Sequence, residues 1–388
     1  MNPTRRFWIL VIIVSISGFS QGMLLPLISA IFEKDGVSST LNGLNATALY
    51  IGTLIVSPFM ELLLRRFGYK PLILYGGALV FVSLMAFPLW KSVVFWFVLR
   101  LLIGIGDHAL HFATQTWITS FSSMDRLGKN IAIYGLSFGV GFAVGPQFVP
   151  LMNIYEGLPF IVSSLLCLFA WSFVFLLKNE FPENVQMKGE DVGFWKRVTL
   201  TSSVAWAAFL GPFGFGFLES SLNAMYPVYA LRNGANLVLI SQTLTAFALG
   251  GILTQLPLGM LSDKIGRRAV VLLAFGGGTV FFFVATLIPV ASWWVVFAVF
   301  CAGMFIGSAF SLGIAYMSEL VPKQLLPMGN LLCGFFFSIG SLSGPIVGGY
   351  VMEHTVMNYL MILVILLAFI TVVLLFSPLF MKKKEALD

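Results

Sequence analysis

The segment Gln255–Arg268 reads QLPLGMLSDKIGRR, and a related segment, SPFMELLLRRFGYK, stands about 200 residues earlier at Ser57–Lys70. Each connects the end of one apolar run to the start of the next through a short basic turn. A second pair, GVGFAVGP at Gly139–Pro146 and GSLSGPIVGG at Gly340–Gly349, repeats at nearly the same offset. A repeat this long predicts two related halves, an arrangement found in many transporters with a substrate site between the halves.

The composition excludes a soluble fold. The chain has 388 residues, of which 59% are hydrophobic and 10% charged, whereas soluble proteins carry about 25% charged residues. The net charge of +6 comes from Lys and Arg gathered in a few loops, so we expect no nucleic-acid partner. The three cysteines, Cys167, Cys301 and Cys333, lie far apart in apolar runs, which predicts neither a disulfide framework nor a metal site.

Apolar runs of about 20 residues are long enough to cross a bilayer as helices. They predict about twelve spans, at residues 7–32, 40–64, 71–90, 93–121, 130–152, 157–177, 199–230, 236–261, 269–290, 293–317, 328–352 and 357–380. The polar stretch at residues 178–197 is the one long connection. We therefore predict an all-α membrane protein with a six-helix half at residues 1–177, a linker loop at 178–197 and a second six-helix half at 198–388.

Basic residues fall mainly on one side of this layout, which predicts a multi-pass protein of the cell membrane with both termini and the linker in the cytoplasm. Lys34, Lys91 and Arg232 lie in loops on the opposite side. The residues on the predicted cytoplasmic side are Arg5, Arg6, Arg65, Arg66, Lys70, Arg126, Lys129, Lys178, Lys188, Lys196, Arg197, Lys264, Arg267, Arg268, Lys323 and Lys382–Lys384.

Several motifs resemble those of the major facilitator superfamily. Gly259, Asp263, Gly266, Arg267 and Arg268 stand at the spacing of that superfamily's loop motif, G-x-x-x-D-[RK]-x-G-R-[RK]. The pattern RLLIGIG from Arg100 resembles the fourth-helix motif of its proton-linked exporters. The glycines and prolines of the fifth and eleventh spans resemble its antiporter motif, namely Gly141, Gly145, Pro146, Gly340, Gly344 and Pro345. The resemblance implies the major facilitator fold, alternating access and a likeness to the twelve-helix drug/proton antiporters.

Two segments depart from these motifs. Glu61 occupies the glycine position and Arg65 the aspartate position of the first-half loop, and Val149 and Pro150 replace the last glycines of the fifth-helix motif. In the second half, Asp263 next to Arg267 and Arg268 predicts a charge-assisted gate, with simple membrane anchoring as the alternative. The small-x-x-x-small glycines predict close helix packing, and the prolines predict bends.

The segment Val98–Trp117, VLRLLIGIGDHALHFATQTW, places Arg100, Asp107 and His111 on one face of a membrane helix. Intramembrane charges are costly and are usually functional. In one interpretation Asp107 is a proton site, where burial favours the neutral form and Arg100 the ionised form, and His111 is a relay. The alternatives are a static Arg100–Asp107 pair and a divalent-metal site that adds His108; we prefer the first and expect no metal.

Glu219 in the seventh span is a second candidate for proton coupling or for recognition of a substrate cation. Asn223 lies one turn later, and the alternative is a local hydrogen-bonded pair. Gln21, Asn223, Phe112, Trp117 and Tyr226 are candidates to line a substrate cavity. The first and fourth spans offer few hydroxyl or amide groups of the sort that would enclose a sugar, which favours a hydrophobic or amphipathic substrate.

These features together predict a secondary transporter that exports hydrophobic or amphipathic small molecules in exchange for protons. The alternative is proton-coupled uptake of a metabolite or flipping of a lipid-like substrate. No nucleotide-binding loop or nucleophile–base pair is evident, so we expect no enzyme activity. We expect a monomer whose partners are membrane lipids and a small-molecule substrate, with no cofactor and with the proton as coupling ion.

Overall fold

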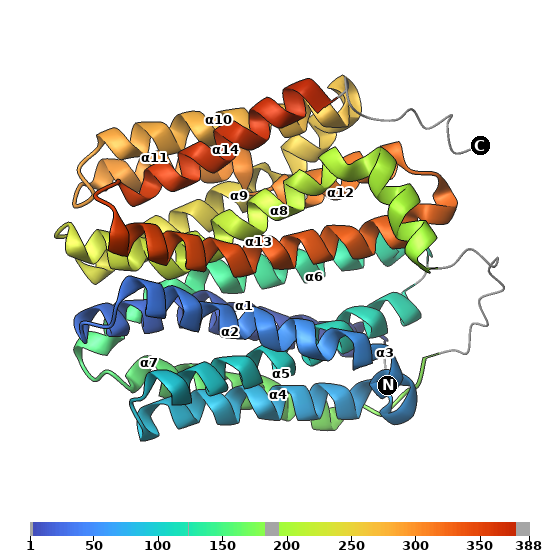
Figure 1. The fold of residues 1–388 in the computed structure, drawn as a ribbon. Helices are drawn as coiled ribbons and strands as arrows, with labels where there is room; N and C mark the ends of the chain where they lie inside the picture. Colours follow the sequence, from blue (N-terminus) through green and yellow to red (C-terminus); the bar gives the residue numbers. More distant parts are fainter. Residues whose placement is uncertain (1–2, 123, 183–193, 378–388) are drawn as a thin grey trace. The chain divides into compact units, whose positions relative to one another are not determined.

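The computed structural model describes residues 3–122, 124–182 and 194–377, and in these ranges every regular element is a helix (Figure 1). The α-helices are α1 (Pro3–Lys34), α2 (Ser39–Val56), α3 (Met60–Phe67), α4 (Tyr69–Ala86), α5 (Val93–Phe121), α6 (Met124–Val144), α7 (Leu158–Ser172), α8 (Phe194–Arg232), α9 (Leu237–Ile265), α10 (Arg267–Leu287), α11 (Trp293–Ile306), α12 (Ala309–Leu320), α13 (Leu326–His354) and α14 (Tyr359–Phe376). The short 3₁₀ helices are η1 (Ser57–Phe59), η2 (Phe87–Leu89), η3 (Gly145–Asn153), η4 (Phe173–Leu176) and η5 (Lys323–Leu325).

Within the described residues, 12 helical segments are long and apolar enough to cross a membrane, so the predicted fold class is confirmed. The fourth segment is Val93–Phe121, as predicted, whereas the seventh is longer than predicted, at Trp195–Arg232. The last segment, Tyr359–Phe376, ends before residue 380. Lys188 and Lys382–Lys384 of the predicted cytoplasmic set, and most of the 178–197 linker, lie outside the described residues.

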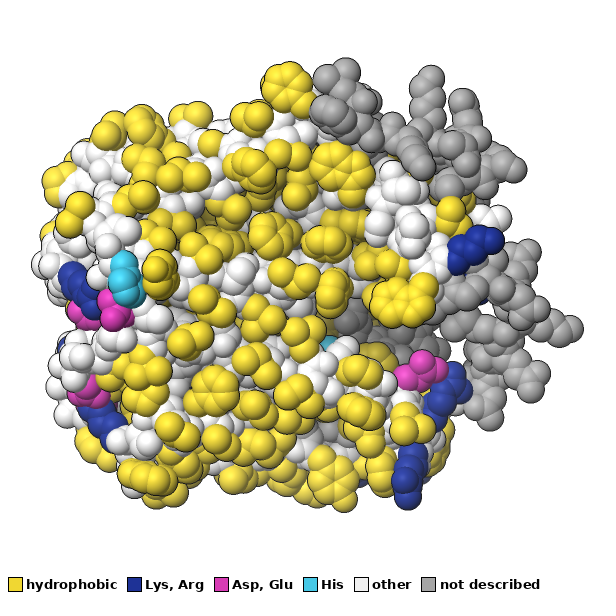
Figure 2. All heavy atoms as spheres, in the orientation of Figure 1, with side chains coloured by type: hydrophobic (Ala, Val, Ile, Leu, Met, Phe, Trp, Pro, Cys, Tyr) yellow, Lys and Arg dark blue, Asp and Glu magenta, His cyan; other side chains and the backbone are white. Residues whose placement is uncertain are grey.

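Apolar side chains cover much of the face seen in Figure 2, and charged side chains gather toward its two ends. The exposed large residues include Val94 and Tyr75 in the first half and Leu253 and Phe297 in the second. A surface that is largely apolar, with charges toward its rims, is what lipid contact requires, because hydrocarbon offers no partner to a charge. The surface therefore agrees with a membrane-spanning protein.

The chain divides into two compact units, Met1–Val185 (unit 1) and Gln186–Asp388 (unit 2). Within unit 1, α1 packs closely against α6, because glycines remove the side chains at the contact. A Cβ on Gly141 would lie 1.9 Å from the Ser15 carbonyl oxygen, and one on Gly18 would lie 2.3 Å from that of Phe138. Helices this close pack backbone to backbone, as small-x-x-x-small patterns permit.

Unit 2 repeats this contact between α8 and α13. A Cβ on Gly340 would lie 2.1 Å from the Phe213 carbonyl oxygen, and one on Gly344 would lie 2.4 Å from that of Phe217. The two prolines of the motifs behave differently: α6 gives way to the 3₁₀ helix η3 at Gly145 and Pro146, whereas Pro345 lies inside the continuous helix α13.

Three connections at one end of unit 1 are joined by Lys91. Its Nζ lies 2.7 Å from Asp35 Oδ2 and 2.8 Å from Glu156 Oε1. Partial burial acts to lower the pKa of Lys91, but hydrogen bonds and charge attraction from both carboxylates outweigh it, so the pKa is raised. Lys91 thus stays charged, and its two ion pairs join the α1–α2, η2–α5 and η3–α7 connections to one another.

Glu180, just after η4, joins the helices at the opposite end of unit 1. Its carboxylate pairs with Arg6 at the start of α1 and accepts a hydrogen bond of 2.8 Å from Trp117 Nε1 at the end of α5. Its backbone oxygen accepts from Tyr69 N at 3.0 Å. The first residues of the predicted linker are therefore a structural part of unit 1.

The corresponding end of unit 2 is organised by the turn between α9 and α10, where Gly266 has a φ of 93°. Arg267 donates to the Ala315 carbonyl oxygen of α12 at 3.1 Å and lies 3.4 Å from Asp263 Oδ1. Arg268 donates to the carbonyl oxygens of Leu374 and Leu375 at 2.9 and 2.8 Å. The turn is thereby fixed to the ends of α12 and α14.

The first-half turn, where Glu61 and Arg65 stand at the glycine and aspartate positions of the motif, lacks that arrangement. These two side chains pair with each other at a distance of 2.8 Å, one helical turn apart and exposed. Lys70 instead donates to the carbonyl oxygens of Phe175 and Leu177 at 3.1 and 2.7 Å. Lys70 therefore occupies the structural place that Arg268 has in unit 2.

Candidate functional site

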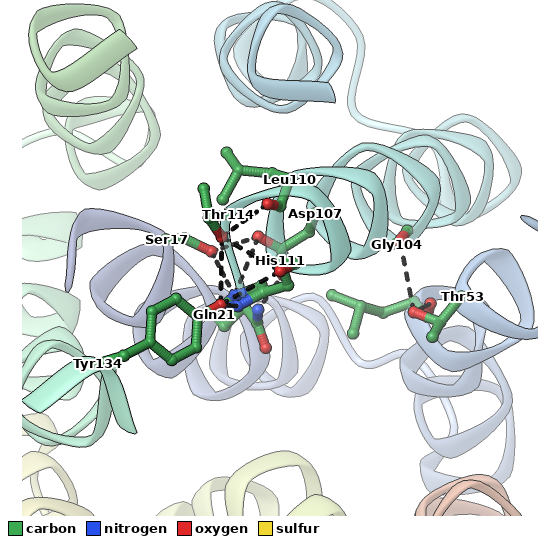
Figure 3. Close-up of polar contacts among 10 residues, drawn as sticks. Ser17, Gln21, Thr53, Gly104, Asp107, Leu110, His111, Thr114 and Tyr134 are labelled. Atoms are coloured by element: carbon green, nitrogen blue, oxygen red, sulfur yellow. Dashed lines mark hydrogen bonds and ion pairs between the residues drawn. The ribbon is translucent and has the colours of Figure 1, made fainter. Parts of the chain in front are cut away.

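Asp107 lies in the middle of α5 and turns its carboxylate toward α1 (Figure 3). Ser17 Oγ donates a hydrogen bond to Asp107 Oδ1, and Gln21 Nε2 donates to Asp107 Oδ2. Asp107 is 5% exposed and Ser17 4%. Both oxygens of this buried carboxylate thus accept hydrogen bonds from neutral groups. These bonds stabilise the anion, but neither donor is a cation that would keep the carboxylate ionised.

His111 extends the site toward α6. Its Nε2 lies 3.0 Å from Ser17 Oγ and 3.8 Å from Asp107 Oδ1, and its Nδ1 lies 2.8 Å from the Tyr134 hydroxyl. Tyr134 also lies 3.2 Å from Thr114 Oγ1, and it reaches the His111 carbonyl oxygen at 3.3 Å. Figure 3 shows this chain of contacts running from Gln21 through Asp107, Ser17 and His111 to Tyr134.

The local sequence explains why these side chains meet. Asp107, His111 and Thr114 are spaced at i, i+4 and i+7 and so share one face of α5. Ser17 and Gln21 are one turn apart on α1. Gly18, next to Ser17, lies against the Phe138 carbonyl oxygen of α6, and this close approach brings Tyr134 within reach of His111.

A small cavity of about 20 Å³ adjoins the carboxylate on the side facing α4 and α7. It is lined by Asp107, Ser17, Cys167, Gly77 and Trp171, with further apolar side chains around them. A cavity of this size holds about one water molecule. Asp107 is therefore enclosed within unit 1, with room for a single water on its far side.

Arg100 belongs to a different group of contacts. Its side chain is fully buried, and its Nη1 donates to Asn45 Oδ1 at 3.0 Å, while its Nη2 lies 3.5 Å from the Leu25 carbonyl oxygen. The static Arg100–Asp107 pair, one of the alternatives drawn from the sequence, is not formed. Arg100 holds α5 to α1 and α2 instead of binding Asp107.

Two residues predicted to line a cavity are packing residues. Trp117 is 0% exposed, stacks on Tyr69 at a centroid distance of 5.2 Å and binds Glu180. Tyr226 is also 0% exposed, and its hydroxyl donates to Thr243 Oγ1 at 3.3 Å within unit 2. Their partners within each unit leave neither side chain open to a ligand in this conformation. Phe112 is partly buried against the apolar core of unit 1.

The second candidate carboxylate, Glu219, lies in α8 of unit 2 and is partly buried. Asn223 Nδ2 donates at 2.8 Å to the backbone oxygen of Glu219, one turn earlier. Among the described residues, no hydrogen bond or ion pair engages the Glu219 carboxylate. A partly buried carboxylate without a partner in its own unit is able to bind a proton or a cationic group.

The metal interpretation finds no support in the described part of the chain, where no group of three or more His, Cys, Asp and Glu side chains lies close enough to hold a metal ion. His108 is partly buried and makes none of the hydrogen bonds that join Asp107, Ser17 and His111. The Asp107 site is a hydrogen-bonded network.

Ser17, Tyr134 and Asn45 were not predicted from the sequence. The position of Ser17, one turn before Gln21, was a signal for it, and Tyr134 lies two turns before Gly141 on the same face of α6. Nothing in the sequence indicated the role of Asn45, because a single amide in an apolar span does not reveal which helix it faces.

A family profile described as Major Facilitator Superfamily matches residues 10–243 and 208–387. The chain belongs to this superfamily. It is 53% identical over 348 residues to the uncharacterized MFS-type transporter YfkF of Bacillus subtilis (strain 168), covering 90% of this chain and 89% of that one. Multidrug resistance protein 1 of the same organism is 26% identical over 355 residues, 87% of each chain.

The structure also resembles that of the nucleoside transporter NupG, with a TM-score of 0.76 at 15% identity over 97% of this chain and 98% of that one. This likeness shows the fold. The predictions of the superfamily and of its twelve-helix fold are confirmed. This major facilitator is thus a membrane transporter, and its Asp107 network lies inside the first of its two units.

Proposed function

We propose that this chain exports hydrophobic or amphipathic small molecules in exchange for protons, with Asp107 as a coupling site. The observation that carries the proposal is the Asp107 carboxylate, buried in a membrane helix and bound by Ser17 and Gln21 rather than by Lys or Arg. A carboxylate paired with arginine stays ionised, whereas one held by neutral donors gains or loses a proton when its access to water changes.

His111 supports this role, because an imidazole is the side chain whose ordinary titration range is closest to neutral pH. It contacts both Ser17 and Tyr134 and lies 3.8 Å from Asp107. It retains 23% side-chain exposure, so it is the member of the network through which protons exchange with water. Glu219 is the second proposed protonation site, in unit 2.

The proposed substrate class and direction draw on two further observations. Several hydroxyl and amide groups of α1 and α5 are already bound within unit 1: Ser17 and Gln21 bind Asp107, and the hydroxyls of α5 at Thr114, Thr116 and Ser120 donate to backbone oxygens of their own helix. The relatives of the chain include multidrug resistance proteins 1 and 2 of Bacillus subtilis. These two observations favour export of an apolar or amphipathic compound over uptake of a polar metabolite.

The experiment uses the whole protein in liposomes with an imposed pH gradient and a panel of amphipathic fluorescent dyes. We expect gradient-driven dye accumulation in the wild type and its loss in Asp107→Asn and in Glu219→Gln. Asp35→Asn, which removes a carboxylate from a connection outside the spans, is the matched control and should keep the activity. Undiminished gradient-driven transport in Asp107→Asn would refute the coupling role of Asp107, and undiminished transport in Glu219→Gln would refute that of Glu219.

A further inference from the structure

We propose that the protonation of Asp107 is transmitted to helix α6 through the tautomer of His111, whose hydrogen-bond partner on α6 is Tyr134. This inference rests on the proposed role of Asp107 as a proton site. Its basis is the unbroken series of contacts Asp107–Ser17–His111–Tyr134, which joins α1, α5 and α6 (Figure 3). Each group in the series has at most one polar hydrogen to donate while neutral, so the direction of one hydrogen bond sets the direction of the next.

The hydrogen count defines the state in which Asp107 is ionised. The Ser17 hydroxyl has one hydrogen, and it is donated to the carboxylate, so Ser17 Oγ must accept from His111. His111 therefore carries its hydrogen on Nε2. Its unprotonated Nδ1 then accepts from the Tyr134 hydroxyl at 2.8 Å. Every hydrogen-bond donor in this series then has an acceptor.

When the proton is on Asp107 Oδ1, the oxygen that faces Ser17, the same contacts are satisfied if every hydrogen bond in the series reverses. The carboxylic acid donates to Ser17, and Ser17 donates to His111 Nε2, which must give up its hydrogen. His111 then carries its hydrogen on Nδ1 and donates to Tyr134. The Nε2 hydrogen of His111 passes to Ser17 and the Ser17 hydrogen passes to Asp107 Oδ1, while one proton from water is taken up at His111 Nδ1. The network gains one proton in total.

Tyr134 can serve both states because its hydroxyl has two other partners in reach. In the second state it accepts from Nδ1 and turns its own hydrogen to the His111 carbonyl oxygen at 3.3 Å or to Thr114 Oγ1 at 3.2 Å. Thr114 is available as an acceptor, since its own hydrogen goes to the Leu110 carbonyl oxygen at 2.8 Å. The hydroxyl of α6 thus changes partner when the proton arrives on α5.

Among the described residues of unit 1, few other titratable groups face this site. They are His108 on α5 and Cys167 on α7, the latter lining the cavity next to Asp107. The contributions of α1 are Ser17 and Gln21, and α4 contributes Gly77 and Val80 to the cavity, none of which titrates. Arg100 on α5 is bound to Asn45. The tautomer of His111 therefore depends mainly on Asp107 and Tyr134.

The test is nitrogen-15 NMR of histidine in the whole protein in lipid bilayers, because the two imidazole nitrogens report the tautomer directly. The chain has three histidines, and a His108→Gln/His354→Gln background leaves His111 as the sole signal. Carbon-13 aspartate labelling follows the Asp107 carboxyl, assigned by its loss in Asp107→Asn. We expect His111 to change from the Nε2–H to the Nδ1–H tautomer as Asp107 becomes protonated.

Tyr134→Phe removes only the hydroxyl. The Nδ1–H tautomer would then leave a buried N–H without an acceptor, which is costlier than a bare lone pair. We expect its population in the Asp107-protonated protein to fall by about tenfold and the pH profile of transport to move toward acid. Tyr359→Phe, which removes a buried hydroxyl bound to Ser221 at 3.0 Å in unit 2, is the matched control and should leave the tautomer change intact.

The outcomes separate this inference from the proposed function. If Asp107 titrates and couples transport while His111 keeps one tautomer throughout, the role of Tyr134 is wrong and the proton site stands. The role of Tyr134 is also wrong if the Tyr134→Phe protein changes tautomer as the wild type does. If gradient-driven transport survives Asp107→Asn, the proposed function fails, whatever tautomer His111 adopts.

Discussion

At the residue scale, Arg100 shows how a buried charge is held without a counter-charge. Its guanidinium is fully buried, and its short hydrogen bond is to the neutral Asn45, whose own Nδ2 donates to the Val93 carbonyl oxygen at 2.8 Å. Hydrogen bonds to charged groups contribute more than neutral ones, about 1.5–3 kcal/mol. Asn45 therefore contributes to stability out of proportion to its size.

Asn45→Ala should lower the free energy of unfolding by about 2–3 kcal/mol, because it leaves a buried cation with one long hydrogen bond. Asn42→Ala is a matched control on the same helix, since the Asn42 amide donates only to the Ser29 carbonyl oxygen at 3.1 Å. We expect the control to cost about 1 kcal/mol. Thermal unfolding of the purified proteins measures both, and equal losses would contradict this assignment.

The polar face of the fourth span could be predicted because its spacing is contained within one helix. The identity of its partners could not. Asp107 binds Ser17 and Gln21, about 90 residues away in the chain, and which face of α1 meets α5 depends on packing rather than on local pattern. For the same reason the sequence favoured Arg100 as the neighbour of Asp107, whereas Arg100 contacts Asn45.

At the scale of elements, the glycines of α6 divide into two kinds. Gly141 lies against the Ser15 carbonyl oxygen of α1, whereas Gly135 has no atom within 4 Å of an added Cβ. Gly141→Ala should separate α1 from α6 and destabilise the protein by about 3 kcal/mol or more, since overpacked sites seldom relax fully. Gly135→Ala should change stability by no more than about 1 kcal/mol.

Thermal unfolding of the two glycine variants in one detergent gives the comparison. Because both substitutions add one methyl group to the same helix, helix propensity cancels. A Gly141→Ala protein as stable as Gly135→Ala would contradict the backbone contact. Unit 2 offers the same comparison, with Gly340 in contact with Phe213 and Gly334 open.

Glu180 is the second element-scale feature, because it connects the start of α1, the end of α5 and the start of α4. Glu180→Ala should lower stability by about 1 kcal/mol, a value reduced by the partial exposure of the carboxylate. Hydrogen exchange should increase in the first turns of α1 and α4. Glu61→Ala breaks an exposed pair one turn apart and should have an effect of about 0.3–0.5 kcal/mol; equal exchange in both variants would count against this role of Glu180.

The helices themselves could be predicted, because the backbone of a long apolar run in a membrane must satisfy its hydrogen bonds internally, and a helix does so within one segment. The predicted bounds agree with α5 at both ends and are short by a few residues for α1 and α8. The contacts of Glu180 with α1, α4 and α5 could not be predicted from the sequence, for a physical reason. Its segment is polar and resembles a loop, and the partners that order it, Arg6 and Trp117, belong to other spans.

At the scale of the whole molecule, the distribution of basic residues predicts that both termini face the cytoplasm. A single cysteine at Val356, which is fully exposed, should then react with a membrane-impermeant thiol reagent added to intact cells. A cysteine at the exposed Lys264 should react only after the membrane is opened. The reverse pattern would invert the proposed orientation.

The proposed transport cycle depends most on the exchange of a proton at Asp107 in each turnover. The direct measurement loads liposomes with a pH-sensitive dye and adds a transported substrate without any imposed pH gradient. The wild type should move protons opposite to the substrate, whereas Asp107→Asn should at most carry substrate down its own gradient with no accompanying proton flux. Proton movement of equal size in Asp107→Asn, or substrate transport by the wild type without proton movement, would contradict this mechanism.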